Sequence, residues 1–114
     1  MPKFAVLMHE DDHAWMRLPA AERERLLALY LDWVRDLKAR GLFAGGDPIG
    51  EGGRVLRAAE GAVSESAYDE SRGVLTGFFL IEAADLPAAT TIARGCPALL
   101  HGETVIVRPV GHSG

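Results

Sequence analysis

The residues from Val74 to Ala83 limit the fold more than any other part of this 114-residue chain. They form a continuous apolar, β-rich run, and side chains alternate between the two faces of a strand. Phe78 and Leu80 therefore lie on one face. Phe79 and Ile81 lie on the other. Because a strand with bulky apolar residues on both faces needs cover on both sides, any fold for this chain must bury both faces of one sheet.

The spacing of apolar residues and the positions of turn residues predict the other elements. Ala20 to Arg40 repeats apolar residues at three-and-four spacing, which predicts an amphipathic helix that ends at Gly41. A second helix follows Asp85, which can cap it, and ends near Gly95. Strands are expected at Phe4–Met8, Arg54–Ala58, Gly61–Val63 and Glu103–Val110, with brief extended pieces in the glycine-dense stretch 41–53 and a frayed tail at Gly111–Gly114.

This order of elements indicates the fold class. Strand, helix, strands, helix, strand matches the split β-α-β, ferredoxin-like arrangement, in which an antiparallel sheet carries both helices on one face. We therefore expect an α+β fold in a single domain over residues 1–114. Two helices cover only one face of such a sheet, and the other face would expose a large apolar patch. A partner sheet is the simplest cover, so we expect a homodimer joined through the sheet faces, a dimeric αβ barrel.

Composition and charge exclude several classes of partner. The net charge is −4 and the Lys and Arg residues are scattered, so the chain has no basic patch for nucleic acid. The amino-terminal apolar run is too short for a signal peptide, and nothing approaches a membrane span. Cys96 is the single cysteine, which excludes an internal disulfide and suits a reducing compartment. We expect a cytoplasmic protein with no nucleic-acid or membrane partner.

Several short motifs together resemble a known family. They are Trp15, the Tyr30 helix ending at Gly41, Gly77–Leu86, Cys96-Pro97, and Val107–Val110 after Gly102. With these residues the chain resembles the YCII-related family, in the branch named for an Asp-Gly-Pro-Phe (DGPF) motif. The resemblance implies a dimeric ferredoxin-like αβ barrel. It implies no established activity, and we expect no cofactor.

The resemblance also implies where a site would lie. Better-studied relatives use a histidine on the first helix together with an aspartate near the sheet. Here Tyr30 occupies the helix position, and Glu65-Ser66-Ala67-Tyr68 stands where the branch has Asp-Gly-Pro-Phe. The acid is thus kept as the longer Glu65 and the aromatic residue as Tyr68.

Glu65 and Tyr30 are the candidate catalytic pair. A carboxylate beside an apolar cleft has its pKa raised and can act as a general base, while a phenol can donate to a developing oxyanion. Such a pair suits an isomerase-like or decarboxylase-like step on a small organic acid. The alternative is that Tyr30 is a core residue of the helix stripe and Glu65 a solvated acid in a polar turn from Ser64 to Arg72.

Three further residues are candidates for ligand binding. Tyr68 follows from the position of the branch motif. Asp47 belongs to Gly45–Pro48, where glycines let backbone amides approach a ligand, although a plain loop is the alternative. Arg108 on the last strand either meets an anionic ligand or pairs with an acid at the dimer surface.

Two other motifs carry less weight. His9-Glu10-Asp11-Asp12-His13 matches the spacing of a zinc-protease helix, but it begins at a strand end and consecutive aspartates are poor helix formers. Only His101 and His112 could add an imidazole, so we expect no metal. Cys96 precedes Pro97 without a base partner and is expected to be a small buried residue rather than a nucleophile.

Two functions without catalysis are also compatible with the sequence. The resemblance allows a binding or regulatory module with a protein partner, because family members are often encoded beside extracytoplasmic-function sigma factors. The other is a dimeric structural unit whose site has decayed, as the altered Asp-Gly-Pro-Phe motif permits.

Overall fold

The computed structural model describes residues 1–111 and contains one antiparallel sheet of four strands. The strands follow the order β2-β5-β1-β6 across the sheet. Their bounds are Lys3–Glu10 for β1, Phe43–Pro48 for β2, Val74–Glu82 for β5 and Thr104–Pro109 for β6. The expected α+β, ferredoxin-like class is confirmed. The prediction of a frayed tail concerns mainly residues 112–114, which lie outside the described residues.

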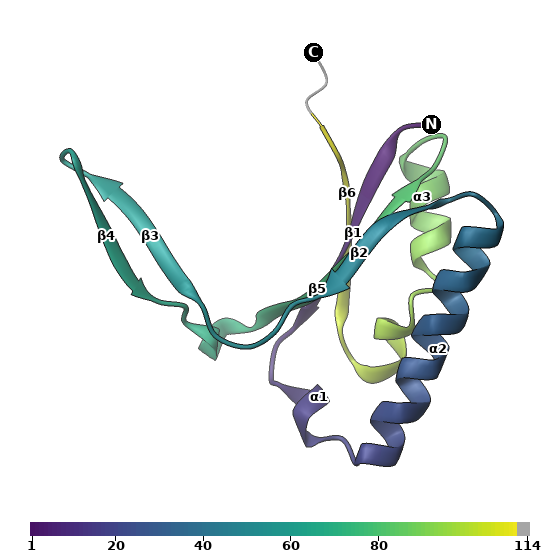
Figure 1. Cartoon of the computed structure of the whole chain (residues 1–114), viewed down its shortest axis with the longest axis horizontal. Coiled ribbons are helices and arrows are strands. Elements are labelled where there is room, and N and C mark those ends of the chain that lie inside the picture. Colours follow the sequence, from purple (N-terminus) through teal and green to yellow (C-terminus); the bar gives the residue numbers. More distant parts are fainter. Residues whose placement is uncertain (112–114) are drawn as a thin grey trace.

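Both long helices pack on the same side of this sheet. They are α2 (Ala20–Ala39) and α3 (Leu86–Ala93), and Figure 1, which views the sheet edge-on, shows both on one side of the strands. Asp85 caps α3 as predicted, because its Oδ1 accepts a hydrogen bond from the Ala88 amide at 2.9 Å. The sequence did not indicate α1 (Ala14–Arg17) or the 3₁₀ segments η1 (Glu70–Arg72) and η2 (Pro97–His101). None of the described helices is long and apolar enough to cross a membrane.

The core lies between the helices and one face of the sheet. Along β1 every second residue is buried, beginning at Phe4 and ending at Glu10. Leu37 of α2 and Ile81 of β5 are fully enclosed in the same cluster. The alternation of side chains predicted for β5 is thus confirmed, because Phe79 and Ile81 both lie on the helix side of the sheet.

The opposite side of the sheet, which we call the open face, also carries apolar residues. In the strand register, Leu7 of β1 lies between Phe78 of β5 and Ile106 of β6, and Ala5 lies next to Leu80. Ile106 is 41% exposed. Neither α2 nor α3 covers this face (Figure 1).

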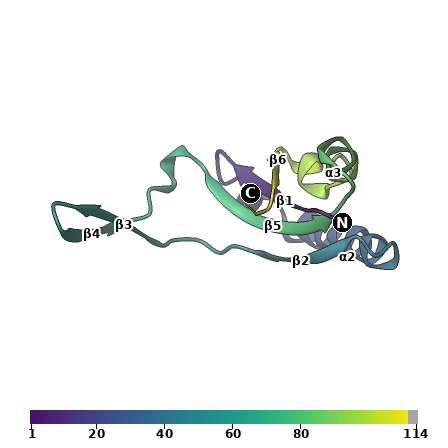
Figure 2. The same ribbon diagram turned by 90° about the horizontal axis from the view of Figure 1, so that it is seen from above.

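The remaining two strands form an arm outside the main sheet. β3 (Arg54–Ala59) and β4 (Ala62–Ala67) form a separate two-stranded sheet, joined by a turn at Glu60 and Gly61 in which both residues have positive φ. Figures 1 and 2 both show this arm projecting away from the sheet on the side without helices. One prediction was wrong here: the stretch from Ser64 to Ala67 is not a turn but part of β4, because it continues the ladder opposite β3.

Candidate functional site

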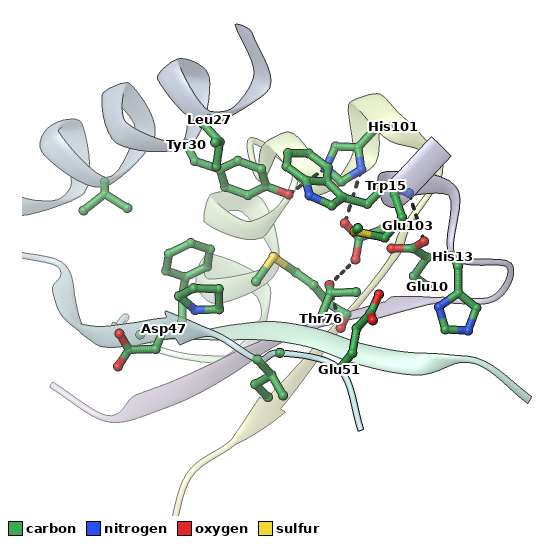
Figure 3. Close-up of a pocket in the computed structure, with 18 of the residues that line it drawn as sticks. Glu10, His13, Trp15, Leu27, Tyr30, Asp47, Glu51, Thr76, His101 and Glu103 are labelled. Atoms are coloured by element: carbon green, nitrogen blue, oxygen red, sulfur yellow. Dashed lines mark hydrogen bonds and ion pairs between the residues drawn. The ribbon is translucent and has the colours of Figure 1, made fainter. Parts of the chain in front are cut away.

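A cavity of about 680 Å³ lies between α2, α1 and the helix side of the sheet. Its walls are largely apolar and aromatic, and its polar side chains gather at one end (Figure 3). Gly46 shapes the floor, because a Cβ at this position would lie within 3 Å of both the backbone and the ring of Phe79. The main wall residues are Met8, Trp15, Leu27, Tyr30, Val34 and Phe79; the polar end holds Glu10, His13, Thr76, His101 and Glu103.

Three polar side chains form a connected series at this end, which we call the relay: Tyr30, His101 and Glu103. The Tyr30 hydroxyl lies 2.8 Å from His101 Nε2, and His101 Nδ1 lies 3.2 Å from Glu103 Oε2 (Figure 3). The second contact has the distance of an ion pair, but Nδ1 does not meet the angular requirement of a hydrogen bond. The imidazole therefore bridges a phenol that lines the cavity and a carboxylate behind it.

Thr76 holds the far end of the relay. Its hydroxyl forms a short hydrogen bond with Glu103 Oε1. Met8 pairs with Gly77 and His9 with Leu75, so Thr76 is the extra residue of a β-bulge in β5. A bulge redirects a side chain that strict alternation would send to the other face. This irregularity gives Glu103 its hydrogen-bond partner.

Burial changes the proton affinities of the relay. Only 4% of the side-chain surface of His101 and of Glu103 is exposed. Burial raises the pKa of the Glu103 carboxyl, and the nearby Glu10 raises it further. The hydrogen bond from Thr76 and the charge of His101 act in the opposite direction and lower this pKa. Burial also raises the pKa of the Tyr30 phenol well above its usual value. The phenol is therefore protonated at rest and able to donate.

Glu10 and Trp15 close the polar end. Glu10 is 4% exposed, and its Oε1 accepts a hydrogen bond from the Trp15 amide at 3.0 Å. This contact fixes the start of α1, so that the Trp15 ring lies 5.1 Å from the His101 ring at an angle of 55°. The indole thus shields the relay from solvent.

The zinc-protease spacing at His9–His13 does not form a metal site. His9 and Glu10 belong to strand β1, and His13 adopts a left-handed backbone conformation, so no helix aligns the two imidazoles. His9 Nδ1 instead lies 3.1 Å from Asp11, and His13 contacts Glu70. Within residues 1–111 no group of three or more His, Cys, Asp or Glu side chains is placed to hold a metal ion.

The two candidate catalytic residues lie in different parts of the chain. Tyr30 lines the cavity, with its ring stacked 6.3 Å from that of Phe79. Glu65 lies on β4 of the arm, opposite Leu56, where it is exposed and does not line the cavity. The expected pairing of Glu65 with Tyr30 is therefore not formed within one chain, because β4 carries Glu65 away from the sheet. His101 is the partner of Tyr30 instead.

The three candidate binding residues also lie apart from the relay. Tyr68 is 38% exposed and borders a second hollow of about 270 Å³ beside Gly53. Asp47 contributes to the cavity lining, but its register opposite Phe78 directs its carboxylate to the open face, away from Tyr30 and His101 (Figure 3). Arg108 pairs in register with Ala5, so it also belongs to the open face.

Cys96 is buried, as predicted. It packs against Met8, and burial raises the pKa of its thiol to about 11. A thiol that stays protonated at neutral pH is a poor nucleophile. Cys96 therefore contributes to the core behind the cavity.

The sequence analysis missed Thr76 and Glu103 and considered Glu10 and His101 only as parts of a metal site. A signal for Glu10 exists, because it continues the alternate inward positions of Phe4, Val6 and Met8. An acidic residue at one of the inward-facing positions of a strand indicates a polar site. Thr76 gives no such signal, since the bulge that redirects it cannot be read from strand alternation.

Comparisons with known proteins agree with this architecture. The YCII-related domain matches residues 3–110. No curated protein matches the sequence. Among solved structures, the chain is similar to 5-chloro-2-hydroxyhydroquinone dehydrochlorinase from Burkholderia phenoliruptrix AC1100, in complex with 2,5-dihydroxybenzoquinone. The TM-score is 0.57 and the identity 18%, over 97% of this chain and 95% of that one, so the likeness concerns the fold.

Proposed function

The chain belongs to the YCII-related family, and on this premise we propose that it is an enzyme that moves a proton on a small, uncharged ring compound. The observation that carries the proposal is the relay, Tyr30–His101–Glu103, set into the wall of a largely apolar cavity. A phenol, an imidazole and a carboxylate in series are the parts of a general acid–base system.

The proton follows the contacts of the relay. With the His101 proton on Nδ1, 3.2 Å from Glu103 Oε2, the free Nε2 accepts the Tyr30 O–H. The phenol oxygen then takes a proton from a substrate hydroxyl or from a carbon next to a carbonyl, while its own proton passes to Nε2. The products are a substrate anion and an imidazolium that the Glu103 carboxylate stabilises. Return of the proton to another substrate atom gives an isomer; departure of a chloride with its bonding electrons gives an elimination.

The charge of the lining favours an uncharged ring over the organic acid suggested by the sequence. Among the described residues that line the cavity there is no Lys or Arg, whereas Glu10, Glu51 and Glu103 are acids. A carboxylate ligand would lose its hydration without gaining a cationic partner. The ring-shaped quinone held by the dehydrochlorinase also fits a site walled by Trp15, Tyr30 and Phe79.

We further infer that the chain is a member of the Asp-Gly-Pro-Phe branch, on the motifs quoted above. The acid at the position of the branch motif is Glu65. It takes no part in the reaction that we propose, because it lies on the arm. Tyr30 stands at the helix position of the histidine in better-studied relatives, and His101 supplies an imidazole from the other end of the chain.

The test is a turnover assay with the full chain and a panel of uncharged monocyclic hydroquinones and cyclic enones, chlorinated and unchlorinated. Chloride release and incorporation of solvent deuterium are the two readouts. We expect Tyr30→Phe and His101→Gln each to lower the rate by about 10²–10⁴-fold while the protein stays folded. The matched controls are Tyr68→Phe and Glu65→Gln, which change the same chemical groups outside the cavity and should leave the rate close to native.

Two outcomes would contradict the proposal. Loss of activity in Glu65→Gln but not in Tyr30→Phe would place the chemistry at the arm. Absence of both binding and turnover across the panel would favour the regulatory role with a protein partner.

The assembly that we propose is a homodimer joined through the open face. Phe78, Leu80, Leu7 and Ile106 form an apolar surface there, and burial of such a surface against a second sheet would stabilise the pair. Analytical ultracentrifugation of the native chain and of Leu7→Asp is the direct test. A native chain that remains monomeric at micromolar concentration would contradict it.

A further inference from the structure

We propose that the arm formed by β3 and β4 clasps a second copy of this chain, on the side of the open face. The inference rests on the sheet-face homodimer proposed above and adds a second, separate contact to it. The arm is the part of the described chain with the least support of its own. Every residue of β4 is exposed, and so is every residue of β3 except Val55.

A two-stranded hairpin without further packing is marginally stable in water. One side of the arm nevertheless carries its two most exposed large apolar residues, and we call it the apolar side. In the register of the hairpin, Ala58 pairs with Val63 and Leu56 with Glu65, so Leu56, Ala58 and Val63 lie on the same side. Leu56 is 64% exposed and Val63 is 70% exposed. Arg54 and Glu65 flank these residues on the same side. The opposite side carries Val55, Arg57, Ser64 and Ser66. Leu56 and Val63 therefore form a surface that no other part of residues 1–111 covers.

The overall dimensions show how far the arm departs from the main body. The radius of gyration is 16.2 Å, although a compact domain of this length has about 13 Å. The chain extends over 49 × 46 × 18 Å. In Figure 1 the arm and the sheet form the two sides of a V, and the helices lie outside it. Figure 2 shows from above that the arm and the two long helices lie on opposite sides of the sheet. The uncovered face of the sheet and the arm therefore lie on the same side, where a single partner can contact both.

The charges at the two edges of the sheet favour a second copy as that partner. Asp47 lies on edge strand β2 and Arg108 on edge strand β6, both on the open face and in neighbouring rows of the register. A two-fold axis parallel to the strands places the β2 edge of one chain over the β6 edge of the other. Asp47 of each chain then faces Arg108 of the other chain. The dimer thus has two such pairs, one on each side of the apolar centre of the interface. This arrangement also agrees with the alternative in which Arg108 pairs with an acid at the dimer surface.

The decisive experiment measures the dimer dissociation constant of full-length variants by analytical ultracentrifugation. The double variant Leu56→Asp/Val63→Asp places two charges on the apolar side of the arm. Its control, Ser64→Asp/Ser66→Asp, places the same two charges on the opposite side of the same hairpin. We expect the first to weaken the dimer by at least about tenfold and the control to remain near native. Circular dichroism should show both variants folded, because the main sheet does not depend on the arm.

A spin label at the arm tip provides an independent measurement. Since Cys96 is buried, Glu60→Cys offers a uniquely accessible thiol. In the dimer, a clasped arm gives one narrow distribution of distances between the two labels, and a free arm gives a broad one. Two results together would overturn the clasp and leave the sheet-face pairing intact. They are an unchanged dimer dissociation constant in Leu56→Asp/Val63→Asp and a broad distribution of distances between the two labels. A monomeric native chain would overturn both the clasp and the sheet-face pairing. Neither result affects the test of the relay, which is read from turnover.

Discussion

The two sides of the sheet are built from similar residues and differ in what surrounds them. On the helix side, Ile81 and Leu37 are fully enclosed, and the same packing buries the relay. On the other side, Ile106 and the arm residue Leu56 are exposed to 41% and 64%. The helix side is covered within one chain, whereas no helix among residues 1–111 covers the open face or the arm.

This difference separates the chemistry from the assembly. General acid–base groups need a shielded site in which their proton affinities can be shifted, and the helix side supplies one. Exposed apolar surface on one side of a sheet indicates contact with another molecule. Of the sequence-based site residues, Tyr30 lies on the first side, while Glu65, Asp47 and Arg108 lie on the second or on the arm.

The largest expected effect comes from equal truncations on the two faces. Ile81→Ala leaves a cavity in the closed core and should lower the free energy of unfolding by about 2–5 kcal/mol. Ile106→Ala should cost less than about 1 kcal/mol in dilute protein, because the side chain is partly in solvent already. Urea denaturation measures both. At high protein concentration Ile106→Ala should lower the free energy of unfolding by more, since the open face is then covered in the dimer. Equal losses of unfolding free energy for the two variants at low concentration would contradict the difference between the two faces.

A smaller effect concerns the pH dependence of the relay. The pKa of Glu103 is raised above its ordinary value of 4.5, so the folded chain binds this proton more tightly than the unfolded chain. The resulting stabilisation is fully present below pH 4.5 and is lost as the pH rises through the raised pKa. The Glu103→Gln variant has no carboxyl at this position, so its free energy of unfolding does not show this loss. The unfolding free energy of the variant relative to native should therefore rise with pH in that window, by at most about 1.4 kcal/mol per pH unit.

Thermal or urea unfolding at a series of pH values gives this difference curve. Thr76→Val offers a refinement, because the Thr76 hydrogen bond lowers the Glu103 pKa. Its loss should extend the window to higher pH. A flat difference curve for Glu103→Gln would contradict the assignment of Glu103 as a carboxyl with raised proton affinity.

The smallest expected effect lies in the turn of the arm. Glu60 and Gly61 both have positive φ, at 51° and 81°, and glutamate is poorly suited to this conformation. Glu60→Asn should stabilise the hairpin by up to about 1 kcal/mol, since asparagine tolerates the left-handed region. Hydrogen exchange of the β3 and β4 amides should slow by up to about fivefold, with no change in the amides of β1. Equal slowing in β1 would show that the arm and the sheet open together.

Much of the fold could be predicted because it depends on local patterns. The spacing of Ala20–Arg40 and the cap at Asp85 gave the two long helices, and strand alternation gave the inward and outward residues of β5. The arm was partly missed because polar residues such as Ser64 and Ser66 resemble a turn. They form a strand here because their backbone groups pair with β3, which residue type alone does not reveal.

The candidate site depended on contacts between distant parts of the chain. By itself, the sequence determined the α+β class, the two apolar faces of the sheet and the inward position of Tyr30. Only the tertiary structure decided that His101, 71 residues further along, would be the partner of Tyr30, and that Glu65 would lie on an arm. The physical reason is that strand and helix patterns report which side of an element is buried. Which side chains meet inside the core depends on the packing of α2 against η2 and on one bulge in β5.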